Sequence, residues 1–258
     1  MEPKTGGGPK EIWIFVHGAA GSPAALQGLA REFADDRRRI IIPALAGYGG
    51  TIAPKTMGPL DANEAIISWI LNIAPQERHV LIGHSMGGFL SLKAARNTAH
   101  IDALIAIEPM AFGVLDPNDS DDAVALAWDR AVIAGLLGDD PAQGLPEFIK
   151  AWNDVSWEDF PQRARRALEA GAHRLAIETA AVSADRTMPG DYATIGAPVL
   201  FLQGSASPDA AHRIIARLAC AIPGSETKTI DGVGHFGCMA QPRAFAVAIK
   251  AFVNNGLD

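Results

Sequence analysis

Short apolar runs alternate with longer amphipathic stretches along this chain. Runs of three to five hydrophobic residues, rich in β-branched side chains, are typical of strands that are covered on both faces of a parallel sheet. The amphipathic stretches between them predict helices, and the alternation predicts an α/β fold with a mostly parallel, doubly wound sheet of about six strands. The last run contains Lys228, so we expect it at an edge. The expected strands span 12–16, 40–42, 80–82, 103–107, 199–202 and 227–230, and the expected helices span 23–33, 62–72, 86–97, 209–221 and 242–253.

The alternation stops between residues 112 and 190. This segment shows helical patterns at 121–137, 145–152, 161–170 and 173–184, with no strand-like run between them. It holds 14 acidic and 7 basic residues, so it carries the whole net charge of −7. A shift in composition of this kind suggests a separate structural unit. We therefore expect a core made of 1–111 and 191–258, with a helical cap, 112–190, inserted after the fourth strand.

Composition narrows the possible partners. The chain has 22 Lys and Arg against 29 Asp and Glu, which disfavours nucleic acid as a partner. No apolar run approaches the roughly 20 residues needed to cross a membrane, and the first ten residues lack the apolar centre of a signal peptide and predict a flexible leader. Cys220 and Cys238 are too few for a disulfide framework or a zinc site. We expect a cytoplasmic monomer or homodimer that needs no metal and no cofactor.

The sequence Gly83-His84-Ser85-Met86-Gly87 lies between a predicted strand and a predicted helix. This is a G-x-S-x-G pattern in the context that a nucleophilic serine requires. The turn needs small residues on both sides of the serine, and the helix that follows directs its N–H groups at the reacting atom. The same pattern also fits a tight turn with an inert serine.

A serine hydroxyl needs a neighbouring base to become a nucleophile. His235 lies in a glycine-rich loop after the last predicted strand. Loops at the carboxyl ends of parallel strands open onto one crevice, so His235 can reach Ser85. His84 is adjacent to Ser85 and must point elsewhere, and we expect surface or structural roles for the other histidines.

With these motifs, the chain resembles the small bacterial serine hydrolases of the α/β-hydrolase superfamily, over nearly its whole length. His17-Gly18 is similar to the family's oxyanion loop, and residues 44–49 are similar to its glycine-containing stretch after the second strand. Residues 83–88 resemble the nucleophile elbow, and residues 232–235 resemble the loop of the catalytic histidine. The resemblance implies a catalytic triad under a helical cap. It also implies an oxyanion hole made by the backbone N–H groups of Met86 and Ala19, with Ala20 as an alternative to Ala19.

The acid departs from the family pattern. Most members have an aspartate where this chain has Ser207, and a serine cannot stabilise an imidazolium as a carboxylate does. Some members use an acid at the end of the preceding strand, which is Glu108 here. A carboxylate that ends a buried strand needs a partner, either as the triad acid or in a salt bridge. Glu108 is therefore the expected triad acid, Asp209 is the alternative, and Asp231 is interpreted as a turn residue.

Several apolar residues are candidates for an acyl pocket, although packing between cap and core explains the same residue types. We expect a serine hydrolase that forms an acyl-enzyme with a small, neutral carboxylic ester, or with a related lactone or thioester. The alternatives are a hydrolase of C–C bonds in ring-cleavage diketones and a non-catalytic ligand receptor on the same fold. The candidate pocket residues are Trp152, Phe112 and Phe236, together with Met86 and Trp157.

Overall fold

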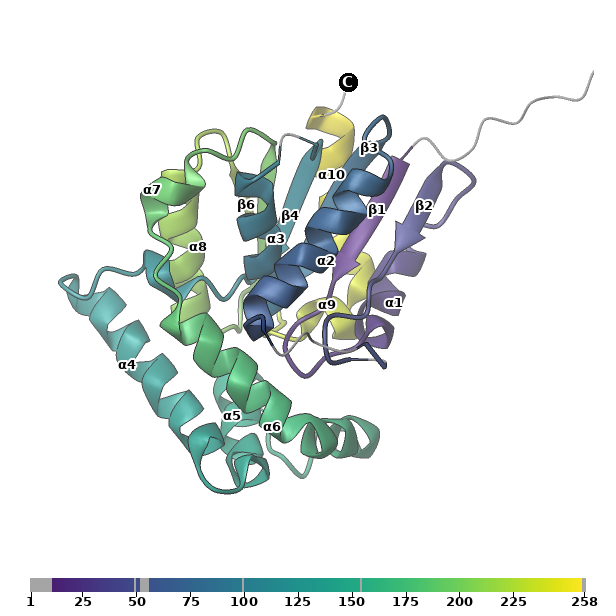
Figure 1. Ribbon diagram of the computed structural model, residues 1–258. Helices are drawn as coiled ribbons and strands as arrows, with labels where there is room; N and C mark the ends of the chain where they lie inside the picture. The colour runs from purple at the N-terminus through teal and green to yellow at the C-terminus, as the bar shows by residue number, and fades with distance from the viewer. Residues whose placement is uncertain (1–10, 49, 52–55, 99, 154, 257–258) are drawn as a thin grey trace, which may run out of the picture.

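The computed structural model describes residues 11–48, 50–51, 56–98, 100–153 and 155–256. The leader, 1–10, and Gly49 of the stretch 44–49 lie outside the described residues. A six-stranded sheet, parallel throughout, has the strand order β2-β1-β3-β4-β5-β6 (Figure 1). Its strands are β1 (Glu11–Val16), β2 (Arg38–Ile41), β3 (Arg78–His84), β4 (Ala103–Ile107), β5 (Val199–Gly204) and β6 (Glu226–Ile230).

Helices cover both faces of the sheet, which is why its central strands are apolar without alternation. The side chains of β4 are buried along its whole length, whereas β6 at the edge has a polar and half-exposed sequence, as its Lys228 predicts. Two hydrophobic clusters, one on each face, form the core. One face packs against α2 (Pro59–Ile73), α3 (Met86–Arg96) and α8 (Asp209–Ala221), and the other against α1 (Pro23–Arg31), α9 (Gly237–Ala240) and α10 (Pro242–Gly256).

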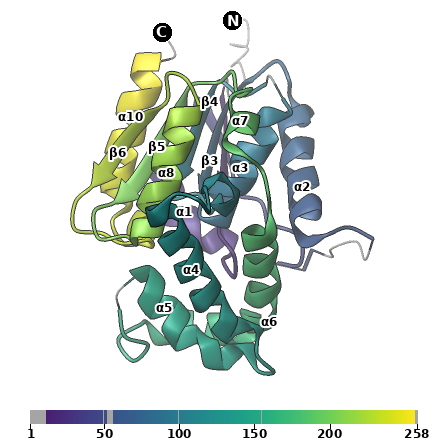
Figure 2. The same cartoon turned by 90° about the vertical axis from the view of Figure 1, so that its left-hand side faces the viewer.

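Among the described residues, the chain between β4 and β5 forms helices and connecting loops and contains no strand. Its three longest helices, which we call the cap helices, lie together beyond the carboxyl ends of the strands (Figures 1 and 2). Short helical turns and α7 (Pro189–Tyr192) complete the segment. The cap helices are α4 (Ser120–Ala134), α5 (Leu145–Asn153) and α6 (Gln162–Ala184), and the turns are η1 (Phe112–Val114), η2 (Gly135–Leu137) and η3 (Pro141–Gly144).

The expectation of two helices at 161–170 and 173–184 is wrong, because α6 is continuous. Gly171 lies inside it, and an interior glycine costs about 1 kcal/mol relative to alanine. The apolar stripe continues past this glycine through Leu175 and Val182, and its burial outweighs that cost. Within the described part of the chain, no helix is both long and apolar enough to cross a membrane.

Candidate active site

Ser85 occupies a sharp turn between β3 and α3. Its backbone has φ 58° and ψ −124°, a strained conformation for a residue with a side chain. The glycines on either side make the turn possible. A Cβ at Gly83 would overlap the carbonyl oxygen of Gly87, and a Cβ at Gly87 would overlap that of Val16. Ser85 is therefore fixed at the carboxyl end of a central strand and at the N-terminus of a helix.

Glu108 immediately follows β4, the next strand of the sheet, and also has a positive φ of 43°. Its carboxylate is buried, with 2% of the residue exposed. One carboxylate oxygen accepts hydrogen bonds from Gly204 N–H at 2.7 Å and from the Ser207 hydroxyl at 2.5 Å. The other accepts from Nδ1 of His235 at 2.7 Å. Burial opposes ionisation, but these bonds outweigh it and hold the pKa of Glu108 below its usual range.

His235 lies in the loop after β6, and two neighbours fix it besides Glu108. Nε2–H of His84 donates to the His235 carbonyl oxygen at 2.8 Å, and the Trp152 ring covers the imidazole with a centroid separation of 4.4 Å. Burial lowers the pKa of His84 to about 3, so that ring is neutral and serves as a donor. With Nδ1 of His235 engaged by Glu108, Nε2 is left to act as a base.

The Ser85 hydroxyl points at a methionine in this structure. Oγ donates to Sδ of Met110 at 3.1 Å, while no hydrogen bond joins Ser85 to His235 among the described residues. Hydrogen bonds between nucleophile and base are often long without substrate and shorten in the reacting complex. Ser85, Met110 and His235 are all nearly inaccessible to solvent, with 6%, 3% and 4% of each residue exposed.

The loop of residues 17–21, which we call the oxyanion loop, packs directly on Ser85. A Cβ at Gly18 would lie 3.0 Å from Cβ of Ser85. The Ala20 N–H donates to the Tyr48 hydroxyl at 2.7 Å, so this amide is engaged. The two expected oxyanion donors, Ala19 and Met86, come from this loop and from the first residue of α3.

Of the expected pocket residues, Trp152 and Phe236 contact His235, and Phe112 contacts Trp152. The ring of Phe236 is 5.7 Å from that of His235, and Phe112 packs edge-on against Trp152 at 6.5 Å. Trp152 is 2% exposed, and its Nε1–H has no hydrogen-bond partner among the residues that the structure describes. The indole thus presents an unused donor beside the imidazole. The structure brings these three aromatic residues together with His235.

Asp209 is exposed at the first turn of α8 and has no hydrogen bond to His235. With Trp128 and Arg213, it lines a cavity of about 750 Å³ between α4 and α8. Asp231, the expected turn residue, is also exposed. Among the described residues, no group of three or more His, Cys, Asp or Glu side chains is arranged to hold a metal ion.

Sequence reasoning missed Met110 and the interaction of His84 with the loop of His235. It also missed Glu178, a fully buried acid on the apolar side of α6. The signal for Glu178 is its place among Leu175 and Val182 in a helical pattern, where an acid needs a partner. Its partner Tyr48 is 130 residues away in the sequence, so the pair could not be read from the pattern alone.

Comparison with known proteins agrees with this geometry. A six-stranded parallel sheet with helices on both faces matches the α/β-hydrolase fold. Residues 13–248 match the model of the alpha/beta hydrolase family, and the chain belongs to that family. No curated protein matches the chain.

Solved structures share the fold at low sequence identity. A bromoperoxidase from Bacillus anthracis superposes with a TM-score of 0.77 at 20% identity, over 96% of this chain and 93% of that one. MenH from S. aureus gives 0.74 at 19% identity, over 98% and 97%. A thermophilic esterase from Thermogutta terrifontis gives 0.72 at 22% identity, over 96% and 91%. Similarity at this level shows the fold and leaves the reaction open.

Proposed function

We propose that the protein is a serine hydrolase that cleaves small, neutral carboxylic esters, or related lactones or thioesters, through an acyl-enzyme on Ser85. The observation that carries this proposal is the combination of two features. One is the strained turn of Ser85 beneath the oxyanion loop, and the other is the 2.7 Å hydrogen bond between His235 and the buried Glu108. The strained turn costs stability locally, and buried ionisable pairs with shifted pKa values concentrate at catalytic sites.

In the proposed reaction, Oγ of Ser85 attacks the ester carbonyl while Nε2 of His235 takes its proton. The negative charge that develops on the carbonyl oxygen is stabilised by the N–H groups of Ala19 and Met86. The C–O bond then breaks, and His235 returns the proton to the leaving alcohol. Water attacks the acyl-enzyme in the same way, His235 again moves the proton, and the carboxylic acid leaves Ser85 free.

Glu108 is proposed as the group that orients and stabilises His235. Its lowered pKa keeps it ionised at neutral pH, so it favours the imidazolium that forms in each step. Ser207, at the position where most family members have an aspartate, donates to Glu108. Ser207 thus holds Glu108 in place, and Glu108 is the proposed acid of the triad.

Charge and packing support a neutral, apolar substrate. The segment 112–190 holds 14 acidic and 7 basic residues above the site, which disfavours the approach of anions. The rings of Trp152 and Phe236 lie against His235, and Phe112 packs on Trp152; these rings offer apolar contacts to an acyl or alcohol group. Hydrophobic surroundings of this kind bind small acyl chains without fixing their identity.

The proposal is tested with a panel of p-nitrophenyl esters of increasing acyl length, with Ser85→Ala as the matched control. We expect turnover that Ser85→Ala abolishes, and faster hydrolysis of a neutral ester than of its carboxylate-bearing analogue at low salt. Added salt narrows that difference, because it screens the cap. A preference for the anionic ester at low salt would refute the neutral substrate. Turnover of a ring-cleavage diketone alone would instead favour the C–C hydrolase.

A further inference from the structure

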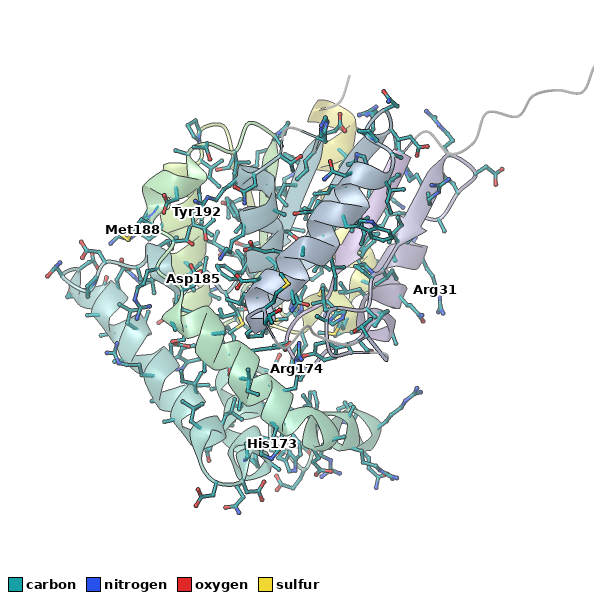
Figure 3. All side chains as sticks on the ribbon, viewed as in Figure 1. Arg31, His173, Arg174, Asp185, Met188 and Tyr192 are labelled. Carbon is teal, nitrogen blue, oxygen red and sulfur yellow. The ribbon has the colours of Figure 1, made fainter. Side chains whose placement is uncertain are left out.

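Three side chains join the cap to the core beside the oxyanion loop. Tyr48 lies in the loop after β2, and Glu178 and Arg174 lie one turn apart on α6. The Tyr48 hydroxyl donates to one carboxylate oxygen of Glu178, and Nε of Arg174 donates to the other at 2.7 Å. We call these three residues the clasp. Figure 3 shows Arg174 on the side of α6 that faces the core.

Arg174 also contacts the backbone of the loop that carries Tyr48. An Nη2–H group of Arg174 donates to the Ala46 carbonyl oxygen. Its guanidinium packs so closely on Gly47, where φ is +84°, that a Cβ at this position would overlap it. The guanidinium also lies over the Tyr48 ring, 5.2 Å from its centroid, so Arg174 contacts both the backbone and a side chain of this loop.

The other end of the clasp reaches the oxyanion loop. The Tyr48 hydroxyl donates a hydrogen bond to Glu178 and accepts one from the Ala20 N–H at 2.7 Å. Ala20 has φ 49°, a left-handed conformation that an alanine keeps only when its surroundings impose it. The Tyr48 ring also contacts His17 edge-on, with centroids 5.1 Å apart. Tyr48 therefore touches the oxyanion loop on both sides of Ala19.

Burial makes these contacts interdependent. Glu178 is fully buried, and that burial raises its pKa, while the hydrogen bonds from Tyr48 and Arg174 oppose the shift. Loss of either donor leaves a carboxylate oxygen without its partner in a medium of low polarity, which is costly. Hydrogen bonds to an ionised group are also short and directional. The position of α6 is thus transmitted to the Ala20 amide through a single hydroxyl group.

We propose that Tyr48, Glu178 and Arg174 are positioning residues through which cap helix α6 sets the conformation of the oxyanion loop and the direction of the Ala19 N–H. This role in catalysis rests on the proposed serine hydrolase function. The clasp stabilises charge in the transition state only through the loop, so its loss lowers kcat and leaves KM nearly unchanged. The cap then acts as part of the catalytic machinery in addition to covering the substrate.

Two measurements on purified full-length protein test this. The first is the rate of covalent labelling by a fluorophosphonate, together with kcat and KM on a p-nitrophenyl ester. The second is hydrogen–deuterium exchange of the peptide that contains residues 17–21, which reports the loop without any catalysis. The variants are Tyr48→Phe, which removes one oxygen atom, Glu178→Ala and the conservative Glu178→Gln.

The matched control is Asp185→Asn. Asp185 is the C-cap of α6 and accepts from Nζ of Lys93 on α3 at 3.0 Å, so it also ties this helix to the core, but at the other end of the helix from Arg174 (Figure 3). We expect Tyr48→Phe and Glu178→Ala to slow labelling and kcat by on the order of tenfold to a hundredfold. We also expect them to speed exchange of the 17–21 peptide. Glu178→Gln, whose amide oxygen still accepts one of the two bonds, recovers part of the loss.

The proposal is overturned if Tyr48→Phe leaves the exchange of the loop unchanged. It is also overturned if the variant raises KM with kcat intact, or if Asp185→Asn has the same effects. Should Glu178→Ala fail to fold, Tyr48→Phe decides alone, because it keeps the ring and its packing. A wild type that neither labels nor turns over esters refutes the proposed function. The exchange measurement still decides whether the clasp holds the loop.

Discussion

Glu108→Gln replaces one carboxylate oxygen of the proposed triad by an amide nitrogen and changes little in shape. If the amide nitrogen takes the place of Oε1, it faces the N–H of Gly204, and two donors oppose each other where a 2.7 Å bond existed. An unpaired buried amide costs about 1–3 kcal/mol. If the nitrogen takes the place of Oε2, it faces Nδ1 of His235. Nδ1 must then become an acceptor, and the ring proton moves to Nε2.

The second orientation keeps the bonds to Gly204 and Ser207, so it is the one that we expect. It places a proton on the nitrogen that must accept the proton of Ser85, and it removes the charge that stabilises the imidazolium. The loss expected for a triad with the wrong tautomer is on the order of 10³- to 10⁴-fold in kcat. This corresponds to about 4–5 kcal/mol of transition-state stabilisation.

The assay is kcat/KM on a p-nitrophenyl ester between pH 5 and 9, with thermal melting to verify the fold. Asp209→Asn is the matched control, because Asp209 is the alternative acid and lies exposed on α8. We expect activity close to wild type from this variant. If Asp209→Asn loses activity while Glu108→Gln keeps it, the assignment of Glu108 as the triad acid is refuted.

Two further predictions concern buried polar groups. Asp129 in α4 is 2% exposed with Ser183 as its hydrogen-bond partner, and burial raises its pKa from 3.8 to about 6. Because the folded state binds this proton more tightly than the unfolded state, the ionised carboxylate destabilises the fold by about 3 kcal/mol above pH 6, and the cost disappears as pH falls toward 4. Asp129→Asn should therefore raise the melting temperature at pH 8 and change it little at pH 4; a lower value at pH 8 would contradict this. Ser207→Ala removes one of the three hydrogen bonds to Glu108 and should lower kcat by about tenfold. The control is Ser205→Ala: the Ser205 hydroxyl accepts from Gly232 N–H at the exposed end of the same loop, and its loss should leave kcat unchanged. Equal effects of the two substitutions on kcat would rule out a specific role for Ser207.

The alternation of apolar and amphipathic stretches predicted the six strands, the parallel sheet and the place of the inserted helices. It did so because a parallel sheet covered on both faces imposes a local and continuous pattern. The strand 103–107 and the helix 209–221 have the predicted bounds. β2 and β3 extend outward to Arg38 and Arg78, polar residues that pair through their backbone and carry no apolar signal.

What the pattern could not provide is contact between distant side chains. Ser85, His235 and Glu108 could be predicted because each has a local signal in the sequence. These signals are the G-x-S-x-G pattern, a glycine-rich loop and an acid at the end of an apolar strand. Met110 has no such signal, and its contact with Ser85 depends on the path of the chain after β4. The partnership of Tyr48 with Glu178 depends on where α6 lies over the core, which only the packed structure determines.

The most direct test of the central claim is the site and stoichiometry of covalent labelling. The protein is incubated with a fluorophosphonate and measured by intact-mass spectrometry, followed by sequencing of the labelled peptide. A serine nucleophile activated by His235 predicts one adduct per chain, on Ser85, and none in Ser85→Ala or His235→Ala. An unlabelled wild-type protein, or an adduct on another residue that persists in Ser85→Ala, would contradict the serine mechanism.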